Sequence, residues 1–123
     1  MEISVSNINV INLNTVILNL DVSGLRTFYK FDSTARHILE SLAIRQNNWK
    51  TTTVSSLYSI FRSIGLVIPR QEIIRVFKEF GKFNCGKFVP GKVAGDRSLQ
   101  SRFVWSVPPG IVGKIAMDKK SRD

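Results

Sequence analysis

The 123-residue sequence has a single cysteine, Cys85, and a single histidine, His37. One cysteine cannot form an intramolecular disulfide, so the chain fits a reducing compartment. One cysteine and one histidine are also too few for a zinc site built from the Cys and His side chains of one chain. We therefore expect no disulfide framework, no metal centre and no cofactor.

Long hydrophobic segments are absent as well. No apolar run approaches the ~20 residues that a transmembrane helix needs, and residues 1–4 lack the basic region and apolar core of a signal peptide. Hydrophobic residues make up 43% and charged residues 22% of the chain, the balance of a soluble globular domain. We expect one folded domain in a soluble cytoplasmic protein, nucleoid-associated if its source is bacterial or viral, with no membrane partner.

Acidic residues are scarce: 9 Asp and Glu stand against 18 Lys and Arg, for a formal net charge of +9. The excess is uneven along the chain. Residues 1–61 hold five basic against four acidic residues, residues 62–105 nine against three, and residues 106–123 four against two. A positive field concentrated in the second half favours an acidic partner.

The N-terminal residues alternate between apolar and polar side chains with period two, which indicates strands. The apolar members are Ile8, Val10, Val16, Leu18, Leu20 and Val22. Asn12 and Asn14 lie between the two runs and tolerate turns, so we predict a β-hairpin extension over residues 1–31. A lone hairpin is barely stable in water, so its apolar face needs a partner: either the rest of the chain or a second copy in a homodimer.

Two helices are expected next. Asp32 or Ser33 can cap the first, which should run to about residue 46. A β-favouring stretch at residues 49–52 precedes the second, which Thr53 can cap and which Gly65 should end. The residues expected on its apolar side are Leu57, Tyr58, Ile60, Phe61 and Ile64.

A third helix should follow Pro69, a residue that suits a first helical turn, and end at Gly81. The side chains expected to face inward are Ile73, Ile74, Phe77 and Phe80; those expected on the opposite face are Gln71, Arg75, Lys78 and Lys82. Such a polar stripe fits a DNA major groove, where Arg can make a forked contact to guanine and Gln to adenine. Arg70, beside the helix start, is better placed for a phosphate. An ordinary solvated face is the alternative.

The remainder predicts two strands, at residues 87–89 and 102–107, around a glycine-containing loop over residues 90–101. Phe103, Trp105 and Val107 should share the inner face, as hairpin core rather than as base-stacking platforms. The basic residues of the segment are Lys87, Lys92, Arg97 and Arg102. A loop carrying them can follow a sugar-phosphate strand or place an Arg in a narrow minor groove. Residues 108–110, Pro-Pro-Gly, break the pattern, and residues 110–123 are expected to be a basic flexible tail.

This order of elements, with the turn RSIGLVIPRQEI and the segment GKFNCGKFVPGKVAGDRSLQSRFVW, resembles the winged helix-turn-helix superfamily over about residues 33–107. The resemblance implies an α+β fold: three helices plus a β-hairpin wing, spanning residues 32–109 and preceded by the N-terminal hairpin. It implies a double-stranded DNA-binding protein, a transcription regulator or replication accessory protein. Winged helices also act as protein-interaction modules, so an adaptor that docks on an acidic partner stays open, as does binding of structured RNA.

Catalysis has no candidate in this sequence. The segment GKFVPGK at residues 86–92 imitates a phosphate-binding loop, but Val93 stands where Ser or Thr would bind the metal ion, and no helix is predicted to follow. Glu72 and Glu79 lie two turns apart on a surface helix. Nothing orients Cys85 and His37 as a nucleophile and base. We expect a protein that is not an enzyme and has no small-molecule substrate.

Overall fold

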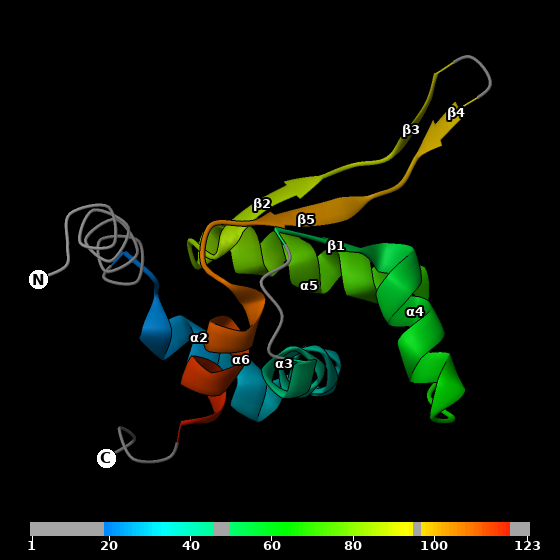
Figure 1. Ribbon diagram of the computed structural model, residues 1–123. Coiled ribbons are helices and arrows are strands. Elements are labelled where there is room, and N and C mark those ends of the chain that lie inside the picture. Colours follow the sequence, from blue (N-terminus) through cyan, green and yellow to red (C-terminus); the bar gives the residue numbers. More distant parts are fainter. Residues whose placement is uncertain (1–18, 46–49, 95–96, 119–123) are drawn as a thin grey trace, which may run out of the picture.

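The computed structural model describes residues 19–45, 50–94 and 97–118 (Figure 1). This part of the chain is α+β, with five helices and two small antiparallel sheets. The elements are α2 (Val22–Phe31), α3 (Ser33–Arg45), β1 (Thr51–Thr53), α4 (Val54–Ser63), α5 (Arg70–Lys82), β2 (Gly86–Val89), β3 (Lys92–Ala94), β4 (Arg97–Leu99), β5 (Arg102–Trp105) and α6 (Pro109–Met117). Most of the predicted N-terminal hairpin falls on residues 1–18, outside the described residues.

Residues 22–31 form the helix α2, so the prediction of a β-rich extension over residues 1–31 is wrong for this stretch. Asp21 caps the helix, and its carboxylate accepts a hydrogen bond from the amide of Gly24 at 2.9 Å. Leu25 is fully buried and Phe28 packs against the core three residues later. From Val22 onward the apolar residues therefore follow helical spacing.

The predicted starts of the next two helices are confirmed. The Asp32 carboxylate accepts from the amide of Ala35 at 2.9 Å in the first turn of α3, and the Thr53 hydroxyl accepts from the amide of Ser56 at 3.1 Å in α4. Gly65 follows α4 with φ of 87°, the left-handed conformation that favours glycine at a helix end. The two helix starts are local, because each depends on one side chain and an amide three residues away.

The larger sheet has the strand order β1-β5-β2, with β5 in the centre. Thr51 of β1, Val104 of β5 and Lys87 of β2 lie in one cross-strand row. Residues 90–101 were predicted to be a loop, but β3 and β4 within this stretch pair with each other. The hairpin therefore continues past the sheet and projects away from the helices (Figure 1).

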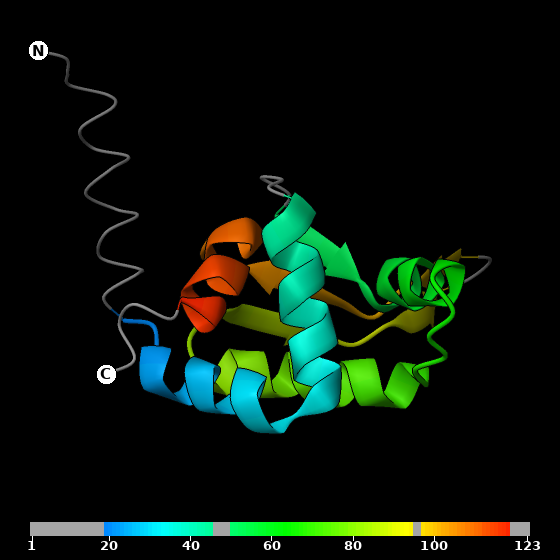
Figure 2. The same ribbon diagram turned by 90° about the horizontal axis from the view of Figure 1, so that it is seen from below.

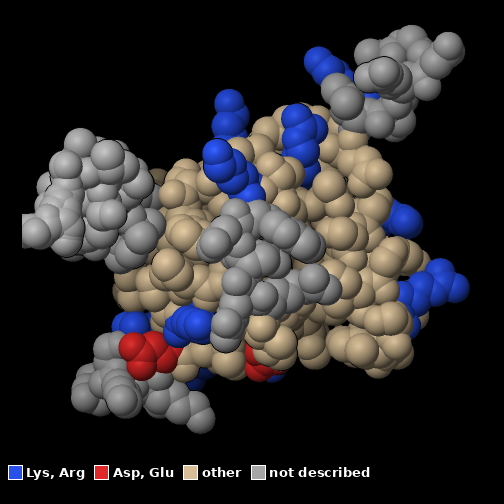
Figure 3. Space-filling view, viewed as in Figure 1, with Lys and Arg blue, Asp and Glu red and all other residues tan. Residues whose placement is uncertain are grey.

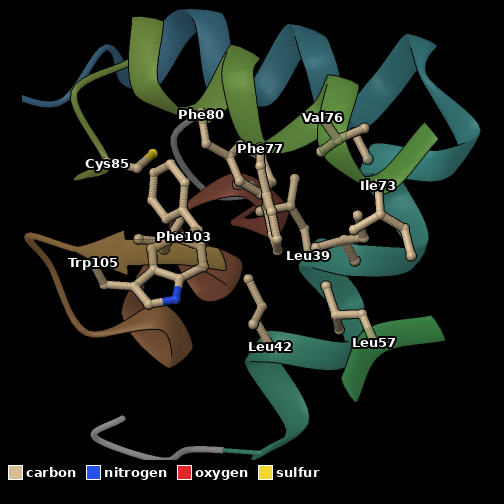
Figure 4. Packing of buried hydrophobic residues seen from close by; sticks show 14 of the residues in the cluster. Leu39, Leu42, Leu57, Ile73, Val76, Phe77, Phe80, Cys85, Phe103 and Trp105 are labelled. Atoms are coloured by element: carbon tan, nitrogen blue, oxygen red, sulfur yellow. The ribbon is translucent and has the colours of Figure 1, made fainter. Parts of the chain in front are cut away.

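The core lies between the sheet and the helices, where aromatic rings of α5 and β5 meet (Figure 4). Phe103 lies 5.5 Å from Phe77 and 4.6 Å from Trp105 between ring centroids. The indole N–H of Trp105 donates to the Thr52 hydroxyl at 2.8 Å, which pairs the one polar atom of this buried side chain. The predicted inward alternation is confirmed for Phe103 and Trp105, whereas β5 ends at Trp105, two residues short of the predicted strand end, and Val107 is buried beyond it.

Residues 109–117 form the helix α6, so the prediction of a flexible tail from residue 110 is wrong for this stretch. Pro109 occupies the first turn, where its missing amide hydrogen costs nothing, and therefore starts a helix rather than breaking structure. Val112 and Ala116 are buried. Gly113 lies so close to α3 that an added Cβ would be 2.5 Å from the carbonyl oxygen of Leu39. Figure 2 shows α6 beside α3.

Candidate nucleic-acid interface

Helix α5 buries one face and exposes the other. Its buried residues are Ile73, Val76, Phe77 and Phe80. Gln71, Lys78 and Lys82 are exposed, as the predicted polar stripe requires, and the Arg75 side chain is 42% exposed. Val76 was missed in the predicted core face, and Ile74 is only partly buried at its edge.

Arg75 is held by two carboxylates. Its Nη1 lies 2.9 Å from Asp32 Oδ2, and its Nη2 and Nε donate to Glu72 Oε1 at 2.9 and 3.2 Å. The hydrogen bonds to Glu72 and then Asp32 raise the pKa of Arg75, so its charge is fixed. A forked contact to guanine, as predicted, would require Arg75 to leave both partners.

Asp32 is the other end of this contact. Burial raises the pKa of its carboxyl, but hydrogen bonds from Arg75 and from the Ala35 amide outweigh burial and hold the pKa below its usual value of 3.8. Because Asp32 also ends α2 and caps α3, Arg75 ties α5 to the junction between these two helices.

The other basic residues of α5 differ in their surroundings. Lys82 forms an exposed ion pair of 3.0 Å with Glu79. Arg70 lies 4.1 Å from the centroid of the Tyr58 ring, a cation–π contact that joins the start of α5 to α4. The Lys78 ammonium lies 5.8 Å from the centroid of Phe88 on β2, so the exposed face of α5 meets the base of the hairpin there.

The hairpin places three cations where no described carboxylate pairs with them: Lys87, Lys92 and Arg102. Phe88 and Phe103 pair across β2 and β5 and face the core. Their chain neighbours Lys87 and Arg102 therefore point to the opposite face of the sheet, because successive side chains of a strand alternate. Arg102 donates to the carbonyl oxygen of Gln100 at 3.1 Å. The backbone of Arg97 belongs to β4, and its side chain lies outside the described part.

The acidic side chains in view lie apart from the basic side chains over the sheet, although other Lys and Arg side chains lie beside them (Figure 3). On the face shown in Figure 3, Lys and Arg side chains gather along the upper edge, over the sheet and the base of the hairpin, and again beside α4. The Asp and Glu side chains in view lie at the lower edge. No Asp or Glu side chain is in view over the sheet on this face, among the residues that the structure describes.

The structure also locates the residues considered for catalysis. Cys85 is fully buried, and burial raises the pKa of its thiol to about 12, so the thiol stays protonated at neutral pH. His37 is on α3, with its ring 6.3 Å from that of Phe61. Across residues 19–45, 50–94 and 97–118, no three His, Cys, Asp or Glu side chains are arranged to hold a metal ion, and no helix could cross a bilayer.

A groove of about 330 Å³ lies between α3 and α4. Ile44 and Ile64 border it with 79% and 68% of their surfaces exposed. Ile64 was predicted to face inward; it lies beyond the last residue of α4, where the helical spacing that would have turned it inward has ended. The groove therefore exposes apolar surface between α3 and α4.

Comparison with known proteins gives no match. No protein-family model matches the chain, and neither a curated protein nor a solved structure does.

Proposed function

We propose that this chain is a winged-helix protein that binds double-stranded DNA and does not catalyse a reaction. The order α3, β1, α4, α5, β2, β5 supports this assignment, as does the sheet order β1-β5-β2, in which the strand between the first two helices of the unit pairs with the last strand. The hairpin between β2 and β5 has the position of a wing. Helix α2 precedes this unit and α6 follows it.

One observation carries the proposal: an exposed polar helix face adjoins a hairpin whose cations Lys87, Lys92 and Arg102 have no described carboxylate partner, and the contact of Lys78 with Phe88 marks where the two surfaces adjoin. A major groove about 12 Å wide admits a helix such as α5, with Gln71 and Lys78 toward the base edges. The hairpin cations then lie against phosphates or in the minor groove. Duplex RNA suits the arrangement less, because its deep and narrow major groove does not admit a helix.

A protein-interaction adaptor is the second candidate, and the groove between α3 and α4 favours it. Ile44 and Ile64 expose apolar surface there that a partner could bury. Substituting Ile44 and Ile64 by Asn would abolish capture of a protein partner in the adaptor and leave DNA affinity unchanged in the DNA-binding protein.

The proposal is tested by titrating the full chain into a labelled random-sequence DNA duplex and a matched RNA duplex at several salt concentrations. Neutralising about six phosphates gives a slope of log K against log salt near −5. We expect that slope and tighter binding to DNA. A flat salt response, or a preference for RNA, would contradict the proposal. Selection from a random DNA pool then separates a sequence-specific regulator from a replication accessory protein that binds without preference.

A further inference from the structure

The cations of α5 and those of the hairpin differ in how many carboxylates they face. Helix α5 with Asp32 holds four basic and three acidic residues, and the acids pair with Arg75 and Lys82. The segment 86–105 holds four basic residues and one acid, Asp96. The hairpin segment therefore has a larger net positive charge than α5 with Asp32, although a helix is the element that fits into a major groove.

The outer face of the β1-β5-β2 sheet presents this charge in a defined pattern. The register places Lys87, Val104 and Thr51 side by side in one row, and Val89, Arg102 and Thr53 in the next. No acidic residue occurs in these three strands. Lys87 and Arg102 are diagonal neighbours on the face, roughly 7–8 Å apart at the backbone by strand geometry.

Val104 gives the same face an apolar centre, since it is 37% exposed between Lys87 and Thr51. A sugar-phosphate backbone combines both properties, because its phosphates are anionic and its deoxyribose carbons are apolar. The rings of α5 occupy the opposite side of the sheet, with Phe77 against Phe103, so this face looks in a different direction from the exposed face of α5. The paired strands β3 and β4 extend the hairpin beyond the sheet (Figure 1).

We propose that the backbone of duplex DNA docks on the outer face of the β1-β5-β2 sheet and along the hairpin, and that this surface contributes more affinity than α5. The inference rests on the proposed function and assigns its main contact surface. Lys87 and Arg102 bind phosphates, Val104 packs against a deoxyribose, and α5 contributes sequence preference through Gln71 rather than most of the affinity.

Two double variants that each remove two positive charges test the inference in the full chain. Lys87→Ala with Arg102→Ala removes two cations of the sheet face that no described carboxylate pairs with. Lys78→Ala with Lys82→Ala removes two cations of α5, of which Lys82 is paired with Glu79. Affinity for a 20-base-pair DNA duplex is measured by fluorescence anisotropy at several salt concentrations. The sheet variant should lose about tenfold or more in affinity and about two units of salt slope, and the α5 variant less than about threefold.

Thermal unfolding checks that each variant is folded, and Lys87→Gln with Arg102→Gln, which keeps the length of both stems, replaces the alanine pair if that pair fails to fold. Amide chemical shifts of the unmodified chain provide a readout free of substitution: added duplex should shift Lys87, Arg102 and Val104 more than Gln71 and Lys78. Equal or larger effects on α5 in either measurement overturn the inference while the proposed function stands. Competition in which duplex RNA or a polyglutamate peptide displaces DNA from the sheet face overturns the assigned occupant. Absence of DNA binding by the unmodified chain overturns the proposed function itself.

Discussion

Arg75 and Asp32, 43 residues apart in the sequence, form an ion pair of 2.9 Å that joins α5 to the junction of α2 and α3. Asp32 has two further duties there, since its backbone N–H donates to the carbonyl oxygen of Phe28 at the end of α2 and its carboxylate caps α3. Arg75, which was predicted to contact a base, therefore links α5 to α2 and α3 through Asp32. Substitutions at this junction should therefore lower the stability of the fold more than they change DNA sequence preference.

Asp32→Ala should lower the free energy of unfolding by about 1–2 kcal/mol at pH 7, most of it from the lost helix cap and less from the partly exposed ion pair. The pKa of Asp32 is held below 3.8, so the carboxylate contributes fully above about pH 5, and the contribution is lost as the pH falls through that lowered pKa. Urea unfolding at pH 7 and pH 3 should therefore show the difference from the unmodified chain shrinking at pH 3. Ser33→Ala, at the exposed neighbour, is the control. A difference that does not change with pH would refute this account.

Arg75→Ala should reduce stability by up to roughly 1 kcal/mol, since the pair is partly exposed, and leave DNA sequence preference unchanged. Gln71→Ala, by contrast, should relax the preference at a selected site, losing about 1–3 kcal/mol there and little elsewhere. Binding of each variant to a preferred and a scrambled duplex, with urea unfolding in parallel, measures both effects. If Arg75→Ala narrows the gap between the two duplexes as Gln71→Ala does, Arg75 reads a base after all.

Thr52→Val should cost about 1–3 kcal/mol, because it leaves the buried indole N–H of Trp105 without its acceptor. Thr51→Val, one residue earlier on the outer face of the same strand, should change stability by less than about 0.5 kcal/mol. Chemical denaturation of Thr52→Val, Trp105→Phe and the double variant forms a cycle in which the two losses should add to more than the loss in the double variant. Strict additivity would mean that the hydrogen bond contributes nothing.

Gly113→Ala should destabilise the protein by roughly 1–3 kcal/mol, because the new Cβ would meet the backbone of α3 at Leu39 and Ala43. Gly81→Ala is the matched control on α5: its Cβ would have its nearest neighbour at 3.8 Å, so helix propensity should leave stability unchanged or raise it by up to about 1 kcal/mol. The midpoint of thermal unfolding should be lower for Gly113→Ala than for Gly81→Ala. Equal midpoints would show that α6 does not pack on α3 in solution.

The homodimer predicted through the N-terminal strands concerns residues outside the described part. The structure indicates where to cut: Asn19 accepts a hydrogen bond from Asn84 at 2.9 Å, and Asp21 caps α2, so a deletion should stop at residue 18. Light scattering at several concentrations should show a dimeric full chain and a folded monomer after the deletion. A full chain that stays monomeric at high micromolar concentration would place the strands on their own chain instead.

Much of the unit between residues 33 and 107 could be predicted from the sequence, because its signals are local. A cap such as Thr53 acts on an amide three residues away, and Gly65 adopts the conformation that its lack of a Cβ allows. The inward alternation of Phe103 and Trp105 followed from strand geometry alone. The exposure of Gln71 and Lys78 followed from helical spacing in the same way.

The two ends of the fold were decided by tertiary structure. A short apolar stretch such as residues 20–31 or 109–117 satisfies more than one periodicity, and which one forms depends on the surface available to bury it. Helices α2 and α6 both bury their apolar residues against α3 and the adjoining core. The pairing of Arg75 with Asp32 was decided in the same way, because it depends on how distant segments pack, which no spacing along the chain encodes. The sequence determined which residues carry charge, which faces are polar and, through the i,i+3 spacing of a helix, the pairs Arg75–Glu72 and Lys82–Glu79. Only the folded chain determined that Arg75 also meets Asp32, and that the hairpin cations Lys87, Lys92 and Arg102 face no carboxylate among the described residues.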